Sequence, residues 1–161
     1  MLKGFKSDYF EKGILPDLKD PFKRNLFNTF VCYVDLENYY PFRLKLNADE
    51  RGSFVETGKL NSGGQVSFST TKSGIKRGNH FHTRKAERFA VINGKALIQL
   101  RRIGTYNVLN FELDGKEPSY VDMPIWYTHN ITNIGTEDLY TIFWINEFFD
   151  LNDPDTFFET V

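Results

Sequence analysis

Apolar residues recur with a helical period near the start of the chain. Five of them are spaced at i, i+4, i+5, i+8 and i+9 and so lie on one face of a helix: Phe22, Leu26, Phe27, Phe30 and Val31. Asp20 and Pro21 come directly before this pattern, as an N-cap and a first-turn proline. The pattern predicts a helix over residues 21–33 whose apolar face packs on the rest of the protein or on a partner chain.

From Phe42 onward the chain changes to short segments of alternating polar and apolar residues. Ala96, Ile98 and Leu100 alternate with more polar positions, as in a strand with one buried face. Turn residues separate the segments, and the pair Asn93-Gly94 is the strongest short-range signal of a β-hairpin. We expect strands at residues 43–46, 52–58, 64–71, 78–82, 87–92, 95–103, 106–113, 119–123, 127–134 and 138–147, then an irregular cover over 148–161.

Many short strands at even spacing, without helices between them, predict an all-β fold, a double-sheet jelly roll. With 161 residues, the chain has the length of one such domain. We expect an N-terminal helical segment over residues 1–41 and a β-barrel domain over residues 42–161. Aromatic residues make up 16% of the chain, which suits a barrel interior and a pocket that stacks a base or a sugar.

The charge balance argues against a polyanionic partner. The 20 basic residues nearly cancel the 21 acidic ones, so no net positive field attracts nucleic acid or a membrane surface. The single cysteine, Cys32, allows no intrachain disulfide. No stretch approaches the roughly 18 apolar residues of a membrane helix, and the first residues lack an apolar signal region. We therefore expect a soluble, cytoplasmic protein.

All three histidines of the chain fall within one spaced pattern. In chain order its members are Gly74, His80, His82, Glu87 and Gly94, then Pro124, His129 and Asn133. His80 and His82 are two apart on a predicted strand and therefore share a face, and His129 is expected from a later strand on the same inner wall. Three imidazoles and the carboxylate of Glu87 are a usual ligand set for Zn, Fe, Mn or Ni.

This spacing resembles that of the cupin family, whose first motif is matched at every position. In the second motif Trp126 replaces the usual glycine, and it either narrows the mouth of a pocket or simply packs. Several sugar-modifying cupins fill the barrel with histidines and bind no metal. We favour a metal here because Glu87 would otherwise be a buried carboxylate without a cation.

A second pair of motifs resembles the dTDP-4-keto-sugar 3,5-epimerases. These motifs are Asp49-Glu-Arg-Gly-Ser-Phe54 and Arg77-Gly-Asn-His80. In those relatives the arginines bind the nucleotide diphosphate and the histidine removes a proton beside a ketone. The resemblance implies substrate-binding roles for Arg51, Arg77 and Asn79, and a general-base role for His80. These residue types suit the chemistry, since arginine binds phosphate in bidentate fashion and histidine exchanges protons near pH 7. Alternatively, Arg51 is a turn residue and Arg77 a solvated strand charge.

Residues 15–161 resemble the C-terminal cupin of bifunctional enzymes that make UDP-N-acetyl-L-fucosamine precursors for capsular and O-antigen polysaccharides. Motifs such as Leu15-Pro-Asp-Leu-Lys-Asp-Pro-Phe22 and Tyr127-Thr-His-Asn130 support this resemblance. It implies epimerisation at C3 of a UDP-4-keto-6-deoxy-sugar, with zinc as the bound metal. In those enzymes a short-chain reductase domain then reduces C4 with NADPH. The chain lacks the Gly-x-Gly-x-x-Gly fingerprint, so we expect no NAD(P) and a separate reductase as a partner.

We also expect a homodimer. The Phe-rich face of the predicted helix and the strand around Arg51 exceed what one small barrel covers. Cupins commonly pair through such strands.

Two features of the sequence leave the mechanism open. His80 matches both a metal ligand of metal cupins and the base of metal-free epimerases, yet a metal-bound imidazole has no free lone pair. Either the metal is structural and another residue is the base, or His80 is the base and the site contains no metal. The acid tyrosine of the 3,5-epimerases falls near Phe143, which cannot donate, and Tyr127 is the candidate replacement.

Three other functions stay open. A sugar 3,4-ketoisomerase would use the same enolate chemistry to move the carbonyl group. A non-catalytic, metal-stabilised cupin would bind a nucleotide sugar or pair with a separate reductase. A metal-dependent oxygenase is the remaining alternative.

Overall fold

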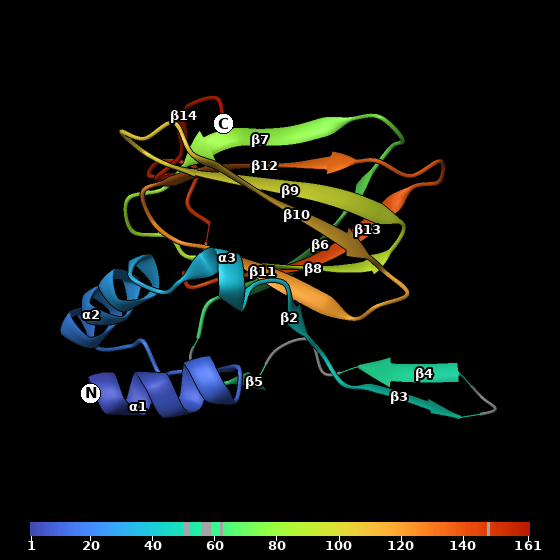
Figure 1. Ribbon diagram of the computed structural model, residues 1–161. Coiled ribbons are helices and arrows are strands. Elements are labelled where there is room, and N and C mark those ends of the chain that lie inside the picture. The colour runs from blue at the N-terminus through green and yellow to red at the C-terminus, as the bar shows by residue number, and fades with distance from the viewer. Residues whose placement is uncertain (50–51, 56–58, 62, 148) are drawn as a thin grey trace.

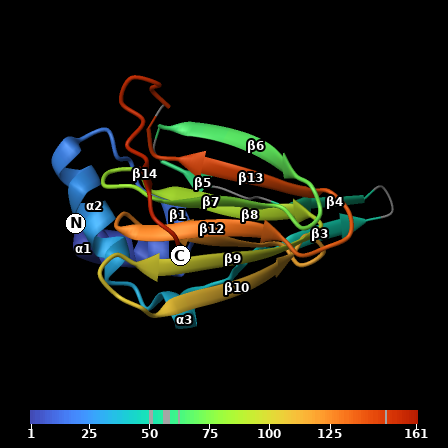
Figure 2. The same ribbon diagram turned by 90° about the horizontal axis from the view of Figure 1, so that it is seen from above.

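Two five-stranded antiparallel sheets face each other and form the predicted jelly roll, in its cupin form (Figures 1 and 2). The computed structural model describes residues 1–49, 52–55, 59–61, 63–147 and 149–161, with the backbone alone for 46–49, 52–55 and 59. One sheet has the order β10 (Val108–Asp114), β9 (Lys95–Arg102), β12 (Tyr127–Asn133), β7 (Lys76–Phe81) and β14 (Phe157–Phe158). The other has the order β2 (Phe42–Arg43), β11 (Ser119–Met123), β8 (Glu87–Asn93), β13 (Leu139–Ile145) and β6 (Gln65–Thr71).

The Asn93-Gly94 turn does not close a hairpin, so that prediction was wrong. β8, before the turn, pairs with β11 and β13, whereas β9, after it, pairs with β10 and β12. Gly94 has φ of 86°, so the turn itself forms as its residues predict. The turn carries the chain from one sheet to the other, because the buried faces of β8 and β9 belong to opposite walls of the same core.

The N-terminal helical segment packs against the outer side of one sheet. It contains α1 (Leu2–Phe5), which continues as the π-helical η1 (Lys6–Glu11), then β1 (Ile14–Leu15), α2 (Pro21–Cys32) and α3 (Leu36–Tyr39). The helix predicted over residues 21–33 is confirmed as α2, and the Asp20 carboxylate caps it by accepting from the Lys23 amide at 2.7 Å. None of the described helices is long and apolar enough to cross a membrane.

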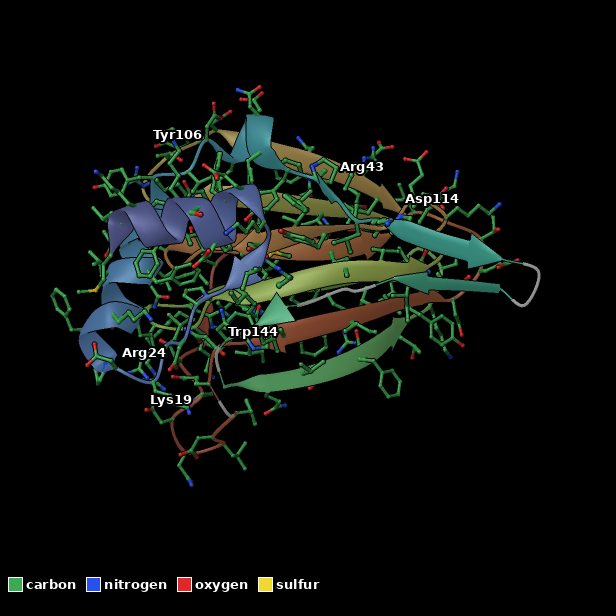
Figure 3. All side chains as sticks on the ribbon, turned by 90° about the horizontal axis from the view of Figure 1, so that it is seen from below. Lys19, Arg24, Arg43, Tyr106, Asp114 and Trp144 are labelled. Atoms are coloured by element: carbon green, nitrogen blue, oxygen red, sulfur yellow. The ribbon has the colours of Figure 1, made fainter. Side chains whose placement is uncertain are left out.

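An apolar cluster joins these helices to the sheet. Its buried members are Phe5, Tyr9, Leu15, Leu18, Phe27, Val31 and Trp144. Trp144 belongs to β13, and the view from below shows the helices lying over this side of the strands (Figure 3). Phe22, which the periodicity placed on the buried face, is 65% exposed and does not belong to this cluster.

A buried ion pair lies at the same interface between the helices and the sheet. Arg88 on β8 and Asp122 on β11 are paired neighbours, and their side chains form two hydrogen bonds of 2.7 and 2.9 Å. The hydroxyl group of Tyr9 in η1 donates to Asp122, and the Arg88 guanidinium also donates to the Gly13 carbonyl at 3.2 Å. The Arg88 guanidinium lies 3.8 Å from the ring centre of Tyr120. The helical segment is therefore bound to the barrel by polar as well as apolar contacts.

A small hairpin extends away from the two sheets (Figure 1). It consists of β3 (Leu46–Asp49) and β4 (Gly52–Val55), and the following β5 (Lys59–Leu60) pairs in parallel with β1. Arg51, a predicted substrate-binding residue, and residues 56–58 of a predicted strand lie outside the described residues.

Candidate functional site

Four candidate metal ligands converge inside the jelly roll. His80 lies on β7 and pairs with His129 on the adjacent β12, while His82 directly follows β7. Glu87 is the first residue of β8 and reaches them from the opposite sheet. Their ligand atoms all lie within 4.8 Å of one another. The structure thus brings together the four residues that the histidine spacing predicted.

The polar atoms of this cluster have the arrangement expected around a cation. Glu87 Oε2 lies 3.2 Å from His129 Nε2 and 3.5 Å from His82 Nε2, and all three atoms are buried. None of the three makes a well-formed hydrogen bond within the described part of the chain. Buried polar atoms without partners are costly. A divalent transition ion would satisfy all three, and a set of imidazoles and one carboxylate fits such an ion.

The other ring nitrogens of two ligands meet backbone carbonyls. His82 Nδ1 lies 2.5 Å from the carbonyl oxygen of Asp155, and His129 Nδ1 lies 3.3 Å from that of Tyr127. A carbonyl oxygen only accepts, so each Nδ1 carries a proton. When the ring is neutral, Nε2 holds the lone pair and directs it toward Glu87. This is the tautomer that a metal ligand needs.

The charges of the cluster also suit a metal centre. Burial, followed by the nearby His129 and His82, lowers the pKa of His80 to about 4, so this imidazole is neutral at pH 7. Burial raises the pKa of the Glu87 carboxyl, but hydrogen bonds and charge from His129 and His82, when those rings also carry a proton at Nε2, outweigh burial and lower it. The same contacts raise the pKa of His82 despite its burial. The cluster therefore presents a carboxylate anion beside a neutral imidazole, which can either bind a metal or accept a proton.

A cavity of about 220 Å³ opens beside His80, Glu87 and His129. Its lining residues are Ser69, Arg77, Gly78, His80, Glu87, Phe89, Met123, His129, Asn130, Ile131 and Phe143. Phe89 and Phe143 stack with ring centres 5.0 Å apart and form an apolar wall. Arg77 is exposed, and its guanidinium donates to the Thr70 carbonyl at 3.1 Å. The cavity thus combines a polar, histidine-lined wall with an aromatic wall and one cationic side chain.

A β-bulge shapes the strand that carries Arg77 and His80. His129 pairs with His80, but the next residue, Asn130, pairs with Gly78, which leaves Asn79 as the extra residue. Asn79 has φ of 62°, and its side-chain oxygen accepts from the Asn130 amide at 3.1 Å. Gly78 has φ of 101°, and a Cβ there would lie 2.7 Å from the His129 carbonyl oxygen. The bulge therefore depends on glycine at this position.

The remaining predicted site residues occupy different surroundings. Asn79 contacts Asn130 and is not among the described residues that line the cavity. Tyr127 is buried in the main core, two residues before His129, and burial raises its pKa. Trp126 is 48% exposed and stacks on Phe81 with ring centres 5.6 Å apart, so it packs on the outside. Its φ of 61° explains why a glycine is usual at this position.

Two further residues contribute to the site and were not predicted as site residues. Asn130 stands in the Tyr127-Thr-His-Asn130 segment, so its place in the cavity could have been inferred from the motif. Asp155 contacts His82 from 73 residues away, and no spacing rule connects the two.

Comparison with known proteins identifies relatives of this chain. The family model for the polysaccharide biosynthesis C-terminal domain matches residues 47–157. UDP-2-acetamido-2,6-beta-L-arabino-hexul-4-ose reductase of Pseudomonas aeruginosa is 37% identical over 134 residues, which cover 83% of this chain and 36% of the relative. The chain therefore spans about a third of the length of that protein.

Solved structures agree with this assignment. The capsular polysaccharide assembling protein CapF of Staphylococcus aureus matches with a TM-score of 0.61 and 37% identity, over 99% of this chain and 43% of that one. A dTDP-6-deoxy-D-glucose-3,5-epimerase, RmlC of Legionella pneumophila, matches with a TM-score of 0.58 over 68% of this chain and 67% of that one. At 17% identity, the latter comparison supports the fold alone.

Proposed function

Because the chain belongs to the polysaccharide biosynthesis C-terminal domain family, we propose that it is a cupin epimerase that inverts C3 of a UDP-linked 4-keto-6-deoxy-sugar for capsular or O-antigen polysaccharide. The observation that carries the proposal is one cavity lined by neutral His80, by Glu87 and His129 of the cluster, and by Arg77. The identity of 37% to CapF, a capsular polysaccharide assembling protein, supports the pathway.

The size of the cavity supports a binding mode in which the sugar is enclosed and the diphosphate is not. Sites that enclose a drug-sized ligand measure about 300–1,000 Å³, and this cavity of about 220 Å³ is smaller. It accommodates the keto-sugar, while the diphosphate lies outside, where the exposed Arg77 can bind it in bidentate fashion. Arg51 and Asn79 are proposed as further substrate-binding residues, on the sequence resemblance.

Epimerisation requires removal of the C3 proton beside the C4 ketone and return of a proton to the other face. His80 is the proposed base, since it is neutral and is the least buried of the three histidines. His82, Glu87 and His129 then form a three-residue metal site, and the alternative is His80 as a fourth ligand. A divalent metal, with zinc as first choice, would supply electrostatic stabilisation of negative charge on the substrate oxygen.

The returned proton requires a donor on the other face of the sugar. Phe143, where the 3,5-epimerases have a tyrosine, lines the cavity and stacks on Phe89 without any donor group. Tyr127 is the proposed acid, on the same strand as His129. A Tyr127→Phe variant that exchanged the C3 proton but no longer inverted C3 would identify it.

Phe143 also favours a second candidate function. A cavity without the usual acid suits a non-catalytic cupin that binds a nucleotide sugar for a separate reductase. The relation to a protein named as a reductase, of which this chain spans 36%, supports such a partner.

Solvent deuterium uptake into UDP-4-keto-6-deoxy-sugars, followed by NMR, tests the proposal. Deuterium at C3 with inversion supports the epimerase. A carbonyl group moved to C3 would instead indicate a 3,4-ketoisomerase. Absence of exchange together with retained UDP-sugar binding would overturn the enzyme and favour the binding partner.

A further inference from the structure

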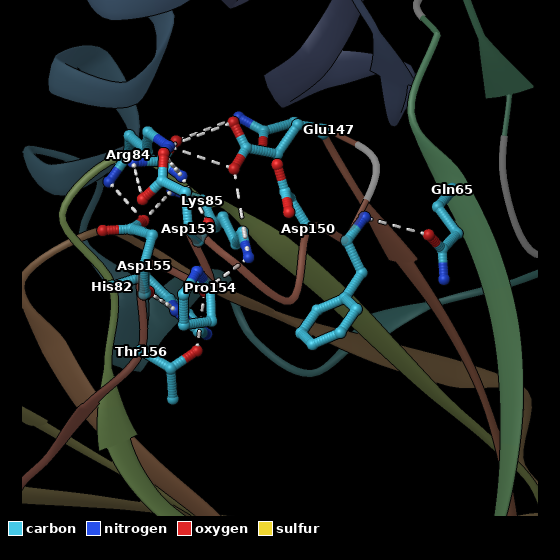
Figure 4. A network of polar contacts seen from close by, with 12 residues as sticks. Gln65, His82, Arg84, Lys85, Glu147, Asp150, Asp153, Pro154, Asp155 and Thr156 are labelled. Atoms are coloured by element: carbon cyan, nitrogen blue, oxygen red, sulfur yellow. Dashed lines mark hydrogen bonds and ion pairs between the residues drawn. The ribbon is translucent and has the colours of Figure 1, made fainter.

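The last segment of the chain lies against His82, one member of the ligand cluster (Figure 4). The carbonyl oxygen of Asp155 lies 2.5 Å from Nδ1 of His82, and both residues are buried. On the other side of the same ring, Nε2 of His82 lies 3.5 Å from Glu87. One backbone carbonyl thus determines which His82 nitrogen carries the proton and which faces the cluster.

The Asp155 carboxylate fixes this carbonyl in place. Its Oδ1 accepts from the Thr83 hydroxyl at 2.6 Å and from the Thr83 amide at 3.1 Å. Its Oδ2 accepts from the amides of Arg84 at 2.9 Å and Lys85 at 3.0 Å. All four donors belong to the turn that directly follows His82. Asp155 therefore binds the turn through its side chain and the His82 ring through its backbone.

Flanking contacts bind the rest of the segment. The buried Lys85 donates to the Pro154 carbonyl at 2.5 Å, and Glu147 lies 3.9 Å from the same ammonium group. Beyond Asp155, β14 pairs with β7 so that Phe158 lies opposite His80. The C-terminal segment is therefore attached to the chain on both sides of His82.

We propose that Asp155 is a positioning residue of the metal centre: it holds the C-terminal segment on residues 83–85 so that its carbonyl keeps His82 protonated at Nδ1 and free at Nε2. The inference rests on the metal centre of the proposed function and not on the reaction. Outer contacts of this kind typically change metal affinity by about 10- to 100-fold. Because linkage is reciprocal, metal binding must in turn stabilise the docked segment.

Asp155→Asn is the main test variant. Asparagine keeps the shape of the side chain and tolerates the φ of 41° found at this position. Its amide group, however, replaces one acceptor oxygen with a donor that faces backbone N–H groups. Asp153→Asn is the matched control, because the Asp153 carboxylate is on the same segment but is 66% exposed and, among the residues that the structure describes, pairs only with Arg84.

Competition between the full-length protein and a chromogenic chelator for Zn²⁺ at pH 7 measures the effect. We expect Asp155→Asn to weaken zinc binding by about 10- to 100-fold and Asp153→Asn to change it by less than about threefold, as for an exposed ion pair. Equal affinities of the two variants would overturn the inference. If Asp155→Asn does not fold, Thr83→Val removes one donor to the same carboxylate and should weaken zinc binding in the same direction.

Nitrogen-15 NMR of the zinc-free protein measures the tautomer of His82, which a general loss of stability would not change. At a pH at which the His82 ring is neutral, we expect its proton on Nδ1 in the wild type and a mixture of tautomers in Asp155→Asn. A wild-type His82 protonated at Nε2 would also overturn the inference. The protein could lack epimerase activity while Asp155→Asn still weakens zinc binding and changes the His82 tautomer. That result would contradict the proposed reaction and still support the role of Asp155.

Discussion

The guanidinium of Arg77 donates to the backbone carbonyl of Thr70 and thereby joins strands of opposite sheets. Arg77 lies on β7 and Thr70 on β6, and 3.1 Å separates the two atoms. At Arg77, β7 pairs with β12 on one side and with no described strand on the other, and β6 is the edge strand of its sheet. The cationic side chain therefore bridges the open edges of the two sheets, at the cavity that it lines.

The bulge at Asn79 brings Arg77 and His80 to this cavity together. Residues three apart on a regular strand point to opposite faces. One extra residue between them shifts the alternation, so that Arg77 pairs with Ile131 and His80 with His129, which share a face of β12. One bound substrate can therefore contact both Arg77, the proposed phosphate-binding residue, and His80, the proposed base.

Arg77→Ala is predicted to weaken UDP binding by roughly 10- to 100-fold, because a charge-assisted contact contributes about 1.5–3 kcal/mol. Arg77→Lys should recover only part of the loss, since an ammonium group cannot bind phosphate in bidentate fashion. Isothermal calorimetry with UDP measures both. Lys76→Ala is the control, since Lys76 is exposed and contacts Gln99. Unchanged UDP affinity in Arg77→Ala, or equally tight binding of a free hexose, would contradict the diphosphate site.

His82→Ala is predicted to abolish binding of a divalent transition metal and to lower the melting temperature of the metal-loaded protein, since metal bound only by the folded state stabilises it. His80→Ala should retain most of the metal if His80 is the base and lose it if His80 is a ligand. Elemental analysis of protein purified without a histidine tag measures the metal content of both variants. Less than about a tenth of an equivalent of metal in the wild type would argue against the centre.

The protein is predicted to be a homodimer, since the outer face of β6 exposes apolar side chains. Phe68 is 73% exposed and Val66 is 59% exposed, next to Tyr140 on β13. Light scattering at micromolar concentration should give twice the chain mass, and Phe68→Glu should shift the protein to monomer. A wild-type mass of 18.8 kDa, that of one chain, would contradict the prediction.

Asp122→Ala is predicted to lower the free energy of unfolding by about 3–5 kcal/mol, because it leaves the buried Arg88 without its counterion. Asp8→Ala is the control, since it removes the exposed pair with Lys12 and should cost less than about 1 kcal/mol. Urea denaturation followed by circular dichroism measures both. Equal midpoints for the two variants would show that the buried pair contributes little.

Alkaline pH is predicted to destabilise the protein through Tyr9 and Tyr40. Burial, and next the charge of Asp122, raise the pKa of both phenols well above the ordinary value. Above about pH 10 the unfolded chain loses these protons while the folded protein keeps them, so stability falls as the pH rises; below that pH the phenols have no effect. Phenolate absorbance from these residues should appear together with loss of circular dichroism. In Tyr9→Phe, the dependence on pH should be weaker.

Local patterns in the sequence determined much of this protein. The 3.6-residue period and the Asp20 cap determined α2, and alternation with turn residues determined most strands of the jelly roll. The spacing of three histidines and Glu87 identified the ligand cluster, because residues two apart on a strand share a face whatever the rest of the chain does.

Only the tertiary structure decided how separate segments meet. The sequence predicted a hairpin at Asn93-Gly94, whereas the packing of two buried faces placed β8 and β9 in different sheets. The bulge that turns Arg77 and His80 to one side depends on the pairing of β7 with β12. The contact of Asp155 with His82 depends on the docking of a tail 73 residues away. Periodicity records only which face of a segment is buried, whereas these relationships depend on which distant segments pack against that face.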